Sequence, residues 1–168
     1  TDNLTLTGTI GATAPPLTSL SVTTTGTTKV LALNANVTTS GTQSYTATGG
    51  ITIGSDRILN STSGTITTNS ALSGATYALT ITGNAAINGS INSVASLSVS
   101  GTTSINADIV TSGNQTYTGN VTLAAAGQTL RTTSNGNISF GGTISNASAK
   151  NLALDTGLTS GTISVTGA

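Results

Sequence analysis

The sequence predicts an all-β chain folded as a right-handed parallel β-helix, a solenoid of stacked coils. The first observation is a repeat: NANVTTSGTQSYT at residues 34–46 returns as NADIVTSGNQTYT at residues 106–118. The second is that apolar residues occur in pairs at alternate positions, such as Ile51 and Ile53, in short stretches between turns rich in Gly, Asn and Ser. Short repeated strands that bury one face are typical of a solenoid, in which like residues stack between neighbouring coils.

The spacing of the repeat predicts how the chain is divided. Tyr45 returns as Tyr117 (117 − 45 = 72), and the phrase SLSV at 19–22 returns at 96–99 (96 − 19 = 77). The degenerate repeat is therefore about 72–77 residues long, enough for several coils of a solenoid. We expect one β-solenoid segment over residues 1–168: the end of a preceding repeat at 1–16, a first repeat at 17–93 and a second at 94–168. With coils of about 20 residues, the chain would make roughly eight coils.

Some local features predict turns rather than strands. Pro15 and Pro16 cannot donate to a strand ladder, so they are expected in a loop at the rim. The phrase at residues 31–33 (LAL) is interpreted as an insertion at a solvent-facing turn, because such turns tolerate added residues. A sandwich fold is disfavoured, since it would need longer strands and a more aromatic core than three Tyr and one Phe can supply.

The composition removes most catalytic and metal-binding chemistry. The chain has four Lys plus Arg, four Asp and no Glu, His, Cys, Met or Trp. These absences remove the usual bases and metal ligands, so we expect no enzyme activity, no metal and no cofactor. The net charge is zero, which favours neither nucleic acid nor an anionic membrane as partner. No apolar run is long enough for membrane insertion.

Three acidic residues are the candidates for acid/base chemistry, because paired carboxylates can cleave glycosidic bonds. They are Asp56, Asp108 and Asp155, and no two are close in sequence. Asp56 and Asp108 occupy different positions in the repeat, and Asp108 aligns with Asn36. The interpretation that we favour is that these residues are solvated turn charges that oppose edge-to-edge pairing of strands.

Six residues mark the repeat, three in each copy. They are Gly41, Gln43, Tyr45, Gly113, Gln115 and Tyr117. The two tyrosines could stack on sugar rings, which would make the chain a carbohydrate-binding β-helix. The alternative, which the repeat favours, is that each tyrosine closes the interior at a coil corner, with its hydroxyl in a hydrogen bond.

Two further patterns concern the surface. Thr-x-Thr phrases begin at Thr5, Thr46 and Thr80, and flat ranks of threonine on a β-helix can bind ice. Ice binding needs the Thr-x-Thr phrase on every coil at one face. In this sequence the phrase alternates with others, such as Leu-x-Val and Ser-x-Phe. Possible N-glycosylation sequons lie at Asn36, Asn60, Asn114, Asn120 and Asn137, although chance matches are expected in a chain so rich in Asn, Ser and Thr.

The phrases SGTQSYT, NVTL, NGNISFGGTIS and NLALDTG resemble the repeats of large bacterial surface exoproteins. These are the filamentous-haemagglutinin-type adhesins of two-partner secretion and the related autotransporter passengers. The resemblance implies a secreted right-handed β-helix, located extracellularly or at the cell surface, that serves as a non-catalytic adhesin shaft and extends a binding region from the cell. The N-terminal secretion domain and the receptor-binding module of this family are not recognisable in the sequence.

Two hypotheses remain for the partners. In the first, the chain is a stretch of a longer adhesin and pairs with neighbouring repeats. In the second, it is a self-assembling subunit of an extracellular fibre, joined end to end with identical subunits. Both follow from the open strand edges that a β-helix presents at its ends. Host or matrix glycans are a further candidate partner.

Overall fold

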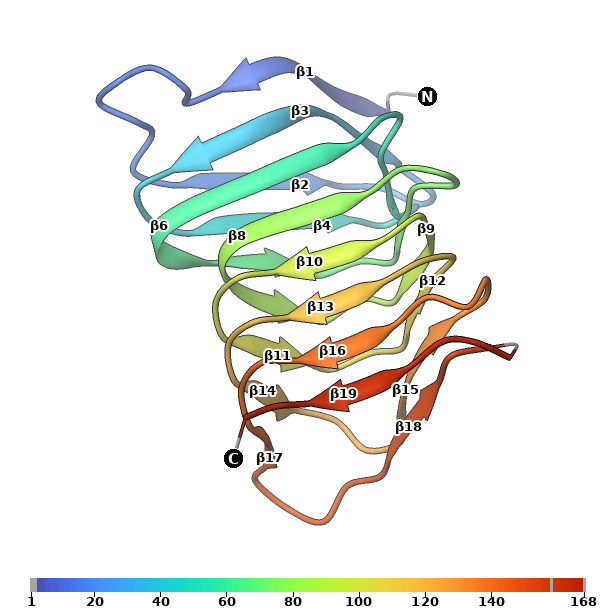
Figure 1. The fold of residues 1–168 in the computed structure, drawn as a ribbon. Coiled ribbons are helices and arrows are strands. Elements are labelled where there is room, and N and C mark those ends of the chain that lie inside the picture. Colours follow the sequence, from blue (N-terminus) through green and yellow to red (C-terminus); the bar gives the residue numbers. More distant parts are fainter. Residues whose placement is uncertain (1–2, 158, 168) are drawn as a thin grey trace.

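The chain forms a right-handed parallel β-solenoid of about seven turns in the computed structural model, which describes residues 3–157 and 159–167 (Figure 1). Every strand pairing is parallel, and the described residues contain no helix. Accordingly, this part of the chain has no helix that could cross a membrane. The predicted fold class, an all-β parallel β-helix, is confirmed.

Three stacks of parallel strands form the sides of the solenoid, and we name them faces A, B and C in the order in which each coil passes through them. Face A holds the first halves of β1 (Leu4–Ile10) and β3 (Leu31–Thr39), then β5 (Ile51–Thr52), β7 (Leu72–Ser73), β9 (Ile91–Val94), β12 (Ile109–Thr111), β15 (Gln128–Thr132) and β18 (Leu152–Asp155). Face B holds the second halves of β1 and β3, the first parts of β6 (Arg57–Thr68) and β8 (Leu79–Ile87), then β10 (Leu97–Val99), β13 (Gln115–Tyr117), β16 (Ile138–Phe140) and β19 (Ile163–Val165). Face C holds β2 (Leu20–Thr24), β4 (Gln43–Ala47), the last parts of β6 and β8, then β11 (Thr103–Ile105), β14 (Val121–Leu123) and β17 (Ile144–Asn146).

The length of a coil changes along the chain. Leu4 pairs with Leu31, so the sequence number advances by 31 − 4 = 27 over the first coil. Leu97 pairs with Gln115, an advance of only 115 − 97 = 18. The extra length of the first coil lies partly in the segment 11–19 between β1 and β2, which contains both prolines, as predicted. The chain makes about seven turns rather than eight because its first and last coils are long.

The interior is built from alternate residues of the strands, as the pleat of a β-strand requires. In β3, for example, every second residue is buried. The buried apolar residues are mostly Val, Ile and Leu, and the rings of Tyr117 and Phe140 stack between coils with centroids 5.2 Å apart. Burying one such aliphatic side chain contributes about 1.5–3 kcal/mol, so the stacked interior is the main source of stability.

The prediction for residues 31–33 was wrong. Leu31 and Leu33 are fully buried at the start of β3, where they pair in register with Leu4 and Leu6 of the preceding coil. They belong to the core because their alternation with Ala32 matches that of the strand beneath them. The phrase is a strand of the solenoid and not an insertion at an exposed turn.

The sequence repeat does not equal a whole number of coils. Gln43 and Tyr45 lie on β4, in the stack of face C, whereas Gln115 and Tyr117 lie on β13, in the stack of face B. The first copy of the motif therefore closes the corner between faces B and C, and the second closes the corner between faces A and B. One local sequence folds at two different corners of the solenoid.

Candidate functional site

The first copy of the repeated motif forms a buried network of hydrogen bonds. The Thr39 hydroxyl donates to the Gly41 carbonyl oxygen at 2.6 Å. Gln43 Nε2 donates to the carbonyl oxygen of Asn60 in the next coil at 2.8 Å and to Thr39 Oγ1 at 3.2 Å. The Tyr45 hydroxyl donates to Gln43 Oε1 at 2.8 Å. The glutamine thus joins a corner of its own coil to the main chain of the following one.

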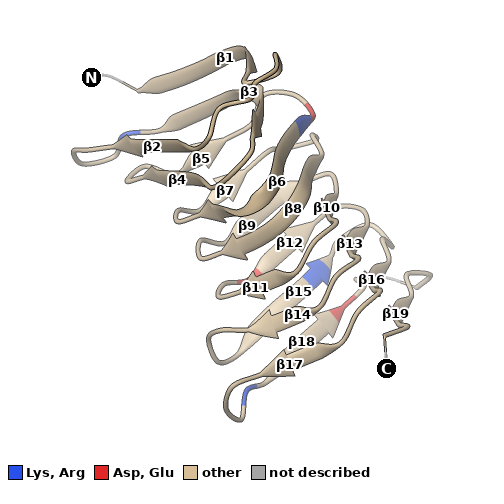
Figure 2. Ribbon diagram, turned by 90° about the vertical axis from the view of Figure 1, so that its left-hand side faces the viewer, with Lys and Arg blue, Asp and Glu red and all other residues tan. Residues whose placement is uncertain are grey.

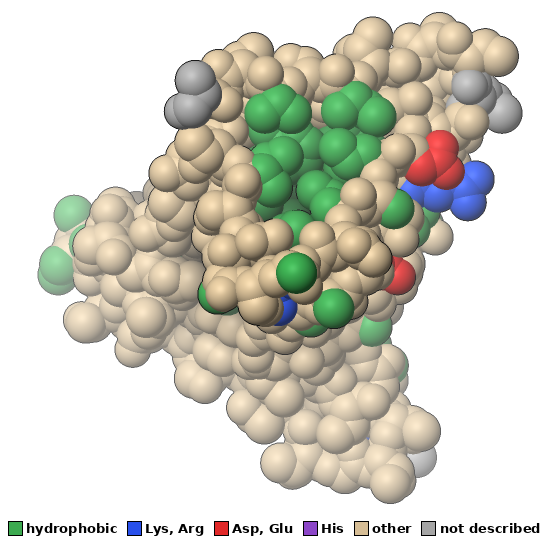
Figure 3. All heavy atoms as spheres, turned by 90° about the horizontal axis from the view of Figure 1, so that it is seen from below, with side chains coloured by type: hydrophobic (Ala, Val, Ile, Leu, Met, Phe, Trp, Pro, Cys, Tyr) green, Lys and Arg blue, Asp and Glu red, His purple; other side chains and the backbone are tan. Residues whose placement is uncertain are grey.

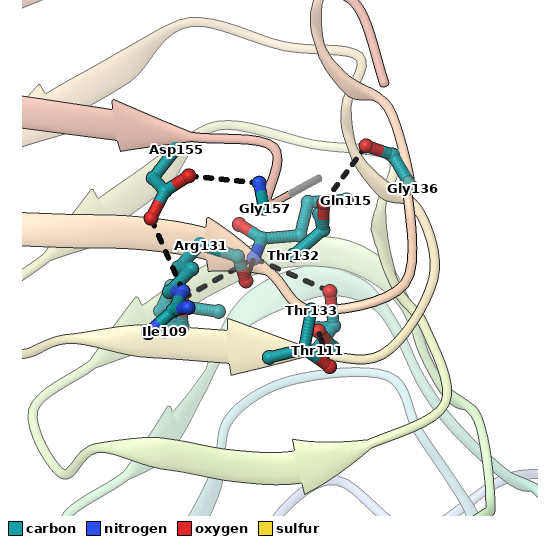
Figure 4. A network of polar contacts seen from close by, with 9 residues as sticks. All are labelled: Ile109, Thr111, Gln115, Arg131, Thr132, Thr133, Gly136, Asp155 and Gly157. Carbon is teal, nitrogen blue, oxygen red and sulfur yellow. Dashed lines mark hydrogen bonds and ion pairs between the residues drawn. The ribbon is translucent and has the colours of Figure 1, made fainter. Parts of the chain in front are cut away.

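The second copy reproduces the same network at its different corner, and Figure 4 shows the part formed by Thr111, Gln115 and Arg131. The Thr111 hydroxyl donates to the Gly113 carbonyl oxygen at 2.5 Å. Gln115 Nε2 donates to the carbonyl oxygen of Arg131 at 2.8 Å and to Thr111 Oγ1 at 3.3 Å, and the Tyr117 hydroxyl donates to Gln115 Oε1 at 3.1 Å. Repetition of each bond shows that the motif specifies corner geometry rather than a surface for binding.

The sequence identified the glutamines and tyrosines of this network but missed its threonines. Thr39 and Thr111 are fully buried, and each both donates to a glycine carbonyl and accepts from a glutamine. Their signal in the sequence is a threonine placed four positions before each repeated glutamine. A buried hydroxyl needs such partners, because an unpaired one costs about 1–3 kcal/mol.

The marker glycines are required by close packing between coils. A Cβ on Gly41 would lie 2.6 Å from the Thr18 carbonyl oxygen, and one on Gly113 would lie 2.9 Å from that of Ala95. Each glycine also donates its backbone N–H to that same oxygen. Neither glycine has a positive φ, so it is the approach of the neighbouring coil, and not a left-handed backbone, that excludes a side chain here.

Tyr45 and Tyr117 are both 0% exposed and present no ring face to a ligand. Burial raises the pKa of each phenol well above that of a solvent-exposed tyrosine. Both therefore stay protonated at neutral pH, and each keeps the hydroxyl hydrogen that it donates to its glutamine. This geometry leaves no role for either residue as a platform for sugar stacking.

Asp56, Asp108 and Asp155 are dispersed, and each of the three has a partner in the fold. Asp56 Oδ1 accepts from the Ala78 backbone N–H at 2.9 Å, and Asp108 Oδ1 accepts from that of Thr129 at 2.7 Å. Asp155 pairs with Arg131 at 3.1 Å across adjacent strands of face A. Figure 2 shows that the few charged residues are spread along the solenoid. Among the described residues, no metal-binding cluster and no pocket are found.

Four of the five sequon asparagines connect successive coils. The side-chain oxygen of each accepts a backbone N–H from the following coil: Asn36 from Ile58 (2.9 Å), Asn114 from Asn137 (2.8 Å), Asn120 from Thr143 (3.1 Å) and Asn137 from Thr162 (2.9 Å). The fifth, Asn60, takes part through its backbone carbonyl, which accepts from Gln43. Asn36 and Asp108, which align in the repeat, have the same role. We call this role capping: a side-chain oxygen accepts a backbone N–H from the next coil. The sequence alone did not predict it.

The three Thr-x-Thr phrases lie on three different faces. Thr5 is on face A, Thr46 on face C and Thr80 on face B. Outward hydroxyls do stack on face B, where the residues in register are Thr80, Ser98, Thr116, Ser139 and Ser164. The rank ends towards the N-terminus, because the next outward residue is the exposed Ile58.

Apolar side chains are exposed at several places along the solenoid, among them Leu17, Ile58 and Tyr77 as well as the first and last coils. Figure 3 looks along the molecule at its C-terminal end, where hydrophobic side chains gather in a hollow. In this last coil Ile163 and Val165 are 47% and 51% exposed, and Leu154 is only partly buried. At the other end Leu4 is 39% exposed.

Comparisons with protein families, with curated proteins and with solved structures gave no match for this chain.

Proposed function

We propose that this chain is a non-catalytic shaft segment of a secreted bacterial surface adhesin, located outside the cell or on its surface. The observation that carries the proposal is the uninterrupted stack of coils, in which the conspicuous polar side chains bond one coil to the next. Gln43, Gln115 and the capping asparagines all serve this purpose. Such an element holds a binding region at a distance and contributes to adhesion and biofilm formation through its length.

The geometry supports this role better than it supports a ligand-binding one. A small-molecule site is normally a concave pocket with converging polar groups, and the described part of the chain has none. The burial of Tyr45 and Tyr117 opposes sugar stacking. Ice binding is opposed by the mixture of Ser and Thr in the hydroxyl rank on face B, which ends at the exposed Ile58.

The shaft role predicts that adhesion depends on whole coils and not on single surface residues. In cells that display this segment within a surface protein, removing residues 91–108 should preserve both display and adhesion. Ile91 pairs directly with Ile109, so this deletion takes out one coil and keeps the column of these two residues in register. The shaft becomes shorter by about 5 Å, the spacing of neighbouring strands. Adhesion to host cells and surface display by antibody are the measurements.

The matched control is a deletion that breaks the register. Removing residues 91–99 takes out β9 and β10, so the turn after face C of one coil leads directly to face C of the next, and display should be lost. Substitutions at outward positions, such as Thr116→Arg on face B and Thr122→Arg on face C, should leave adhesion unchanged. If either substitution abolished adhesion in a folded, displayed protein, the segment would itself contain the binding surface and the shaft role would be refuted.

A further inference from the structure

Three departures from the solenoid pattern meet at one corner between faces A and B. Arg57, at the start of β6, occupies an inward position and pairs with Leu79. Ile58, the next residue, points outward and is 48% exposed. Tyr77, in the turn that leads into β8, is 36% exposed. Proteins that follow their sequence pattern elsewhere tend to break it at functional sites, so this corner is a candidate for a binding site.

The column in which Arg57 lies is otherwise part of the core. It continues through four buried residues, Leu79, Leu97, Gln115 and Ile138. Arg57 is itself partly buried, and its Nε atom is buried without a hydrogen-bond partner. No ion pair joins it to a carboxylate of the described residues. A guanidinium group in this state lacks the anion that it binds best, and a buried polar atom without a partner calls for such an explanation.

The backbone holds Tyr77 beside this arginine. Asp56 Oδ1 accepts the N–H of Ala78 at 2.9 Å, and the Arg57 N–H donates to the Ala78 carbonyl oxygen at 2.9 Å. These two bonds fix the turn that carries Tyr77 against the turn that carries Arg57. Of the three tyrosines and one phenylalanine in the chain, Tyr77 is the only one that is exposed.

The turn before Tyr77 has an unusual backbone. Ala75 has a φ of 48°, in the left-handed region that residues other than glycine rarely adopt. The Tyr77 N–H donates to the Gly74 carbonyl oxygen at 2.8 Å and closes the turn. Such conformations cost free energy and cluster at functional sites. An unfavourable turn therefore holds the one exposed aromatic ring on the surface, in the coil that follows Arg57.

We propose that this corner binds a carboxylate-bearing sugar, such as a uronic acid unit of an acidic polysaccharide. The guanidinium group of Arg57 donates to the carboxylate, and the ring of Tyr77 packs on the apolar side of the sugar ring, beside Ile58. A free small molecule normally needs a pocket, and the described residues form none. One unit of an extended polysaccharide can stack on an exposed ring without a pocket, so binding is weak and rapidly reversible.

The site goes beyond the proposed shaft role and does not depend on it. Thr116 lies two coils beyond Thr80, the partner of Ile58, and Thr122 lies on face C. The outward-facing variants that test the shaft role therefore leave this corner unchanged. Sugar binding is measured on the purified chain, whereas the shaft role is measured as adhesion, so the two proposals fail through different measurements.

Trigalacturonic acid is the probe, and its methyl ester, which has the same rings without the charge, is the matched ligand. When the acid is titrated into the isotope-labelled chain, the backbone N–H resonances of Ala78 and Thr80 should shift, while that of Thr122 should not. The ester should bind about tenfold more weakly, because it cannot form charge-assisted hydrogen bonds with the guanidinium group.

Variants separate the two halves of the site. Arg57→Gln should weaken binding about tenfold and Tyr77→Leu about three- to tenfold, whereas Tyr77→Phe keeps the ring and should bind like the unmodified chain. Gln115 shows that the column accepts a glutamine, and Tyr77 lies on the surface, so circular dichroism should show a retained fold. Arg131→Gln removes an equal charge from an arginine that is paired with Asp155, and it should leave binding unchanged.

Three results would overturn the inference. Equal binding of the acid and its ester would show that the carboxylate is not recognised. Equal weakening by Arg131→Gln and Arg57→Gln would show that only net charge matters. Equal binding of polyaspartate would show that the carboxylate is recognised without the sugar.

Discussion

Replacing Gln115 by leucine should lower the free energy of unfolding by about 3 kcal/mol, since each buried polar group left without a partner costs about 1–3 kcal/mol. The substitution keeps an apolar side chain of similar volume in the core and removes the amide. The Arg131 carbonyl oxygen then loses its donor, and the Tyr117 hydroxyl loses its acceptor. Urea unfolding followed by circular dichroism measures the effect. Gln43→Leu should behave alike, because its network is the same.

The matched control is Gln128→Leu. Gln128 is also buried, but its Oε1 atom has no hydrogen-bond partner. Because this oxygen makes no hydrogen bond, the substitution removes none there. The free energy of unfolding should therefore change by no more than about 1 kcal/mol. If Gln128→Leu lowered the free energy of unfolding as much as Gln115→Leu, the hydrogen bonds of the network would add nothing to the packing of the side chain.

A double variant separates the hydrogen bonds from the packing. Tyr117→Phe removes the hydroxyl that Gln115→Leu leaves unpaired, while the ring can still stack on Phe140. The combined loss should therefore be smaller than the sum of the two single losses by about 0.5–3 kcal/mol, the usual range for residues in contact. Strict additivity would show that the two side chains do not depend on one another.

The local chemistry of the corner could be predicted from sequence, because it is contained within a short stretch. Gln43 and Tyr45 are two positions apart, and Thr39 lies four positions before the glutamine. A motif this compact folds in the same way wherever the chain places it. For the same reason the repeat indicated a role in the structure for both tyrosines before any contact was known.

The face on which each motif lies could not be predicted, because it depends on the summed lengths of all the coils between. One coil runs from Leu97 to Gln115 and another, much longer, from Leu4 to Leu31, and the difference is decided by turns such as residues 11–19. The alternation of inward and outward residues is the same on every face, so it carries no information about which face is which. A small change in one turn shifts every later motif around the axis.

The capping residues were missed for a related reason. Asn36 accepts the N–H of Ile58, and Asp108 accepts that of Thr129, each a full coil further along the chain. Nothing beside either residue in the sequence reveals the partner, since it is brought near only by completing a coil. The sequons and charges were therefore interpreted as surface features, whereas the structure places most of them at contacts between coils.

The buried tyrosines should make the fold unusually sensitive to alkali. In the unfolded chain, a tyrosine titrates near pH 10, whereas burial raises the folded pKa of Tyr45 and Tyr117 far above this. Their contribution is fully present below the unfolded pKa and is lost as the pH rises towards the folded one. Between the two values, the free energy of unfolding should fall by about 1.4 kcal/mol per pH unit for each tyrosine.

Urea unfolding at a series of pH values measures this slope. The unmodified chain should lose about 2.7 kcal/mol per pH unit above pH 10 once both phenols contribute. In the variant Tyr45→Phe/Tyr117→Phe, the tyrosine-dependent part of the slope should disappear, although the stability at neutral pH falls because two hydrogen bonds are lost. Absorbance near 295 nm should show the two phenols ionising only as the chain unfolds, since the folded solenoid keeps both protonated. Ionisation of Tyr45 and Tyr117 before unfolding would contradict this account, because charged phenols could not remain in so apolar an interior.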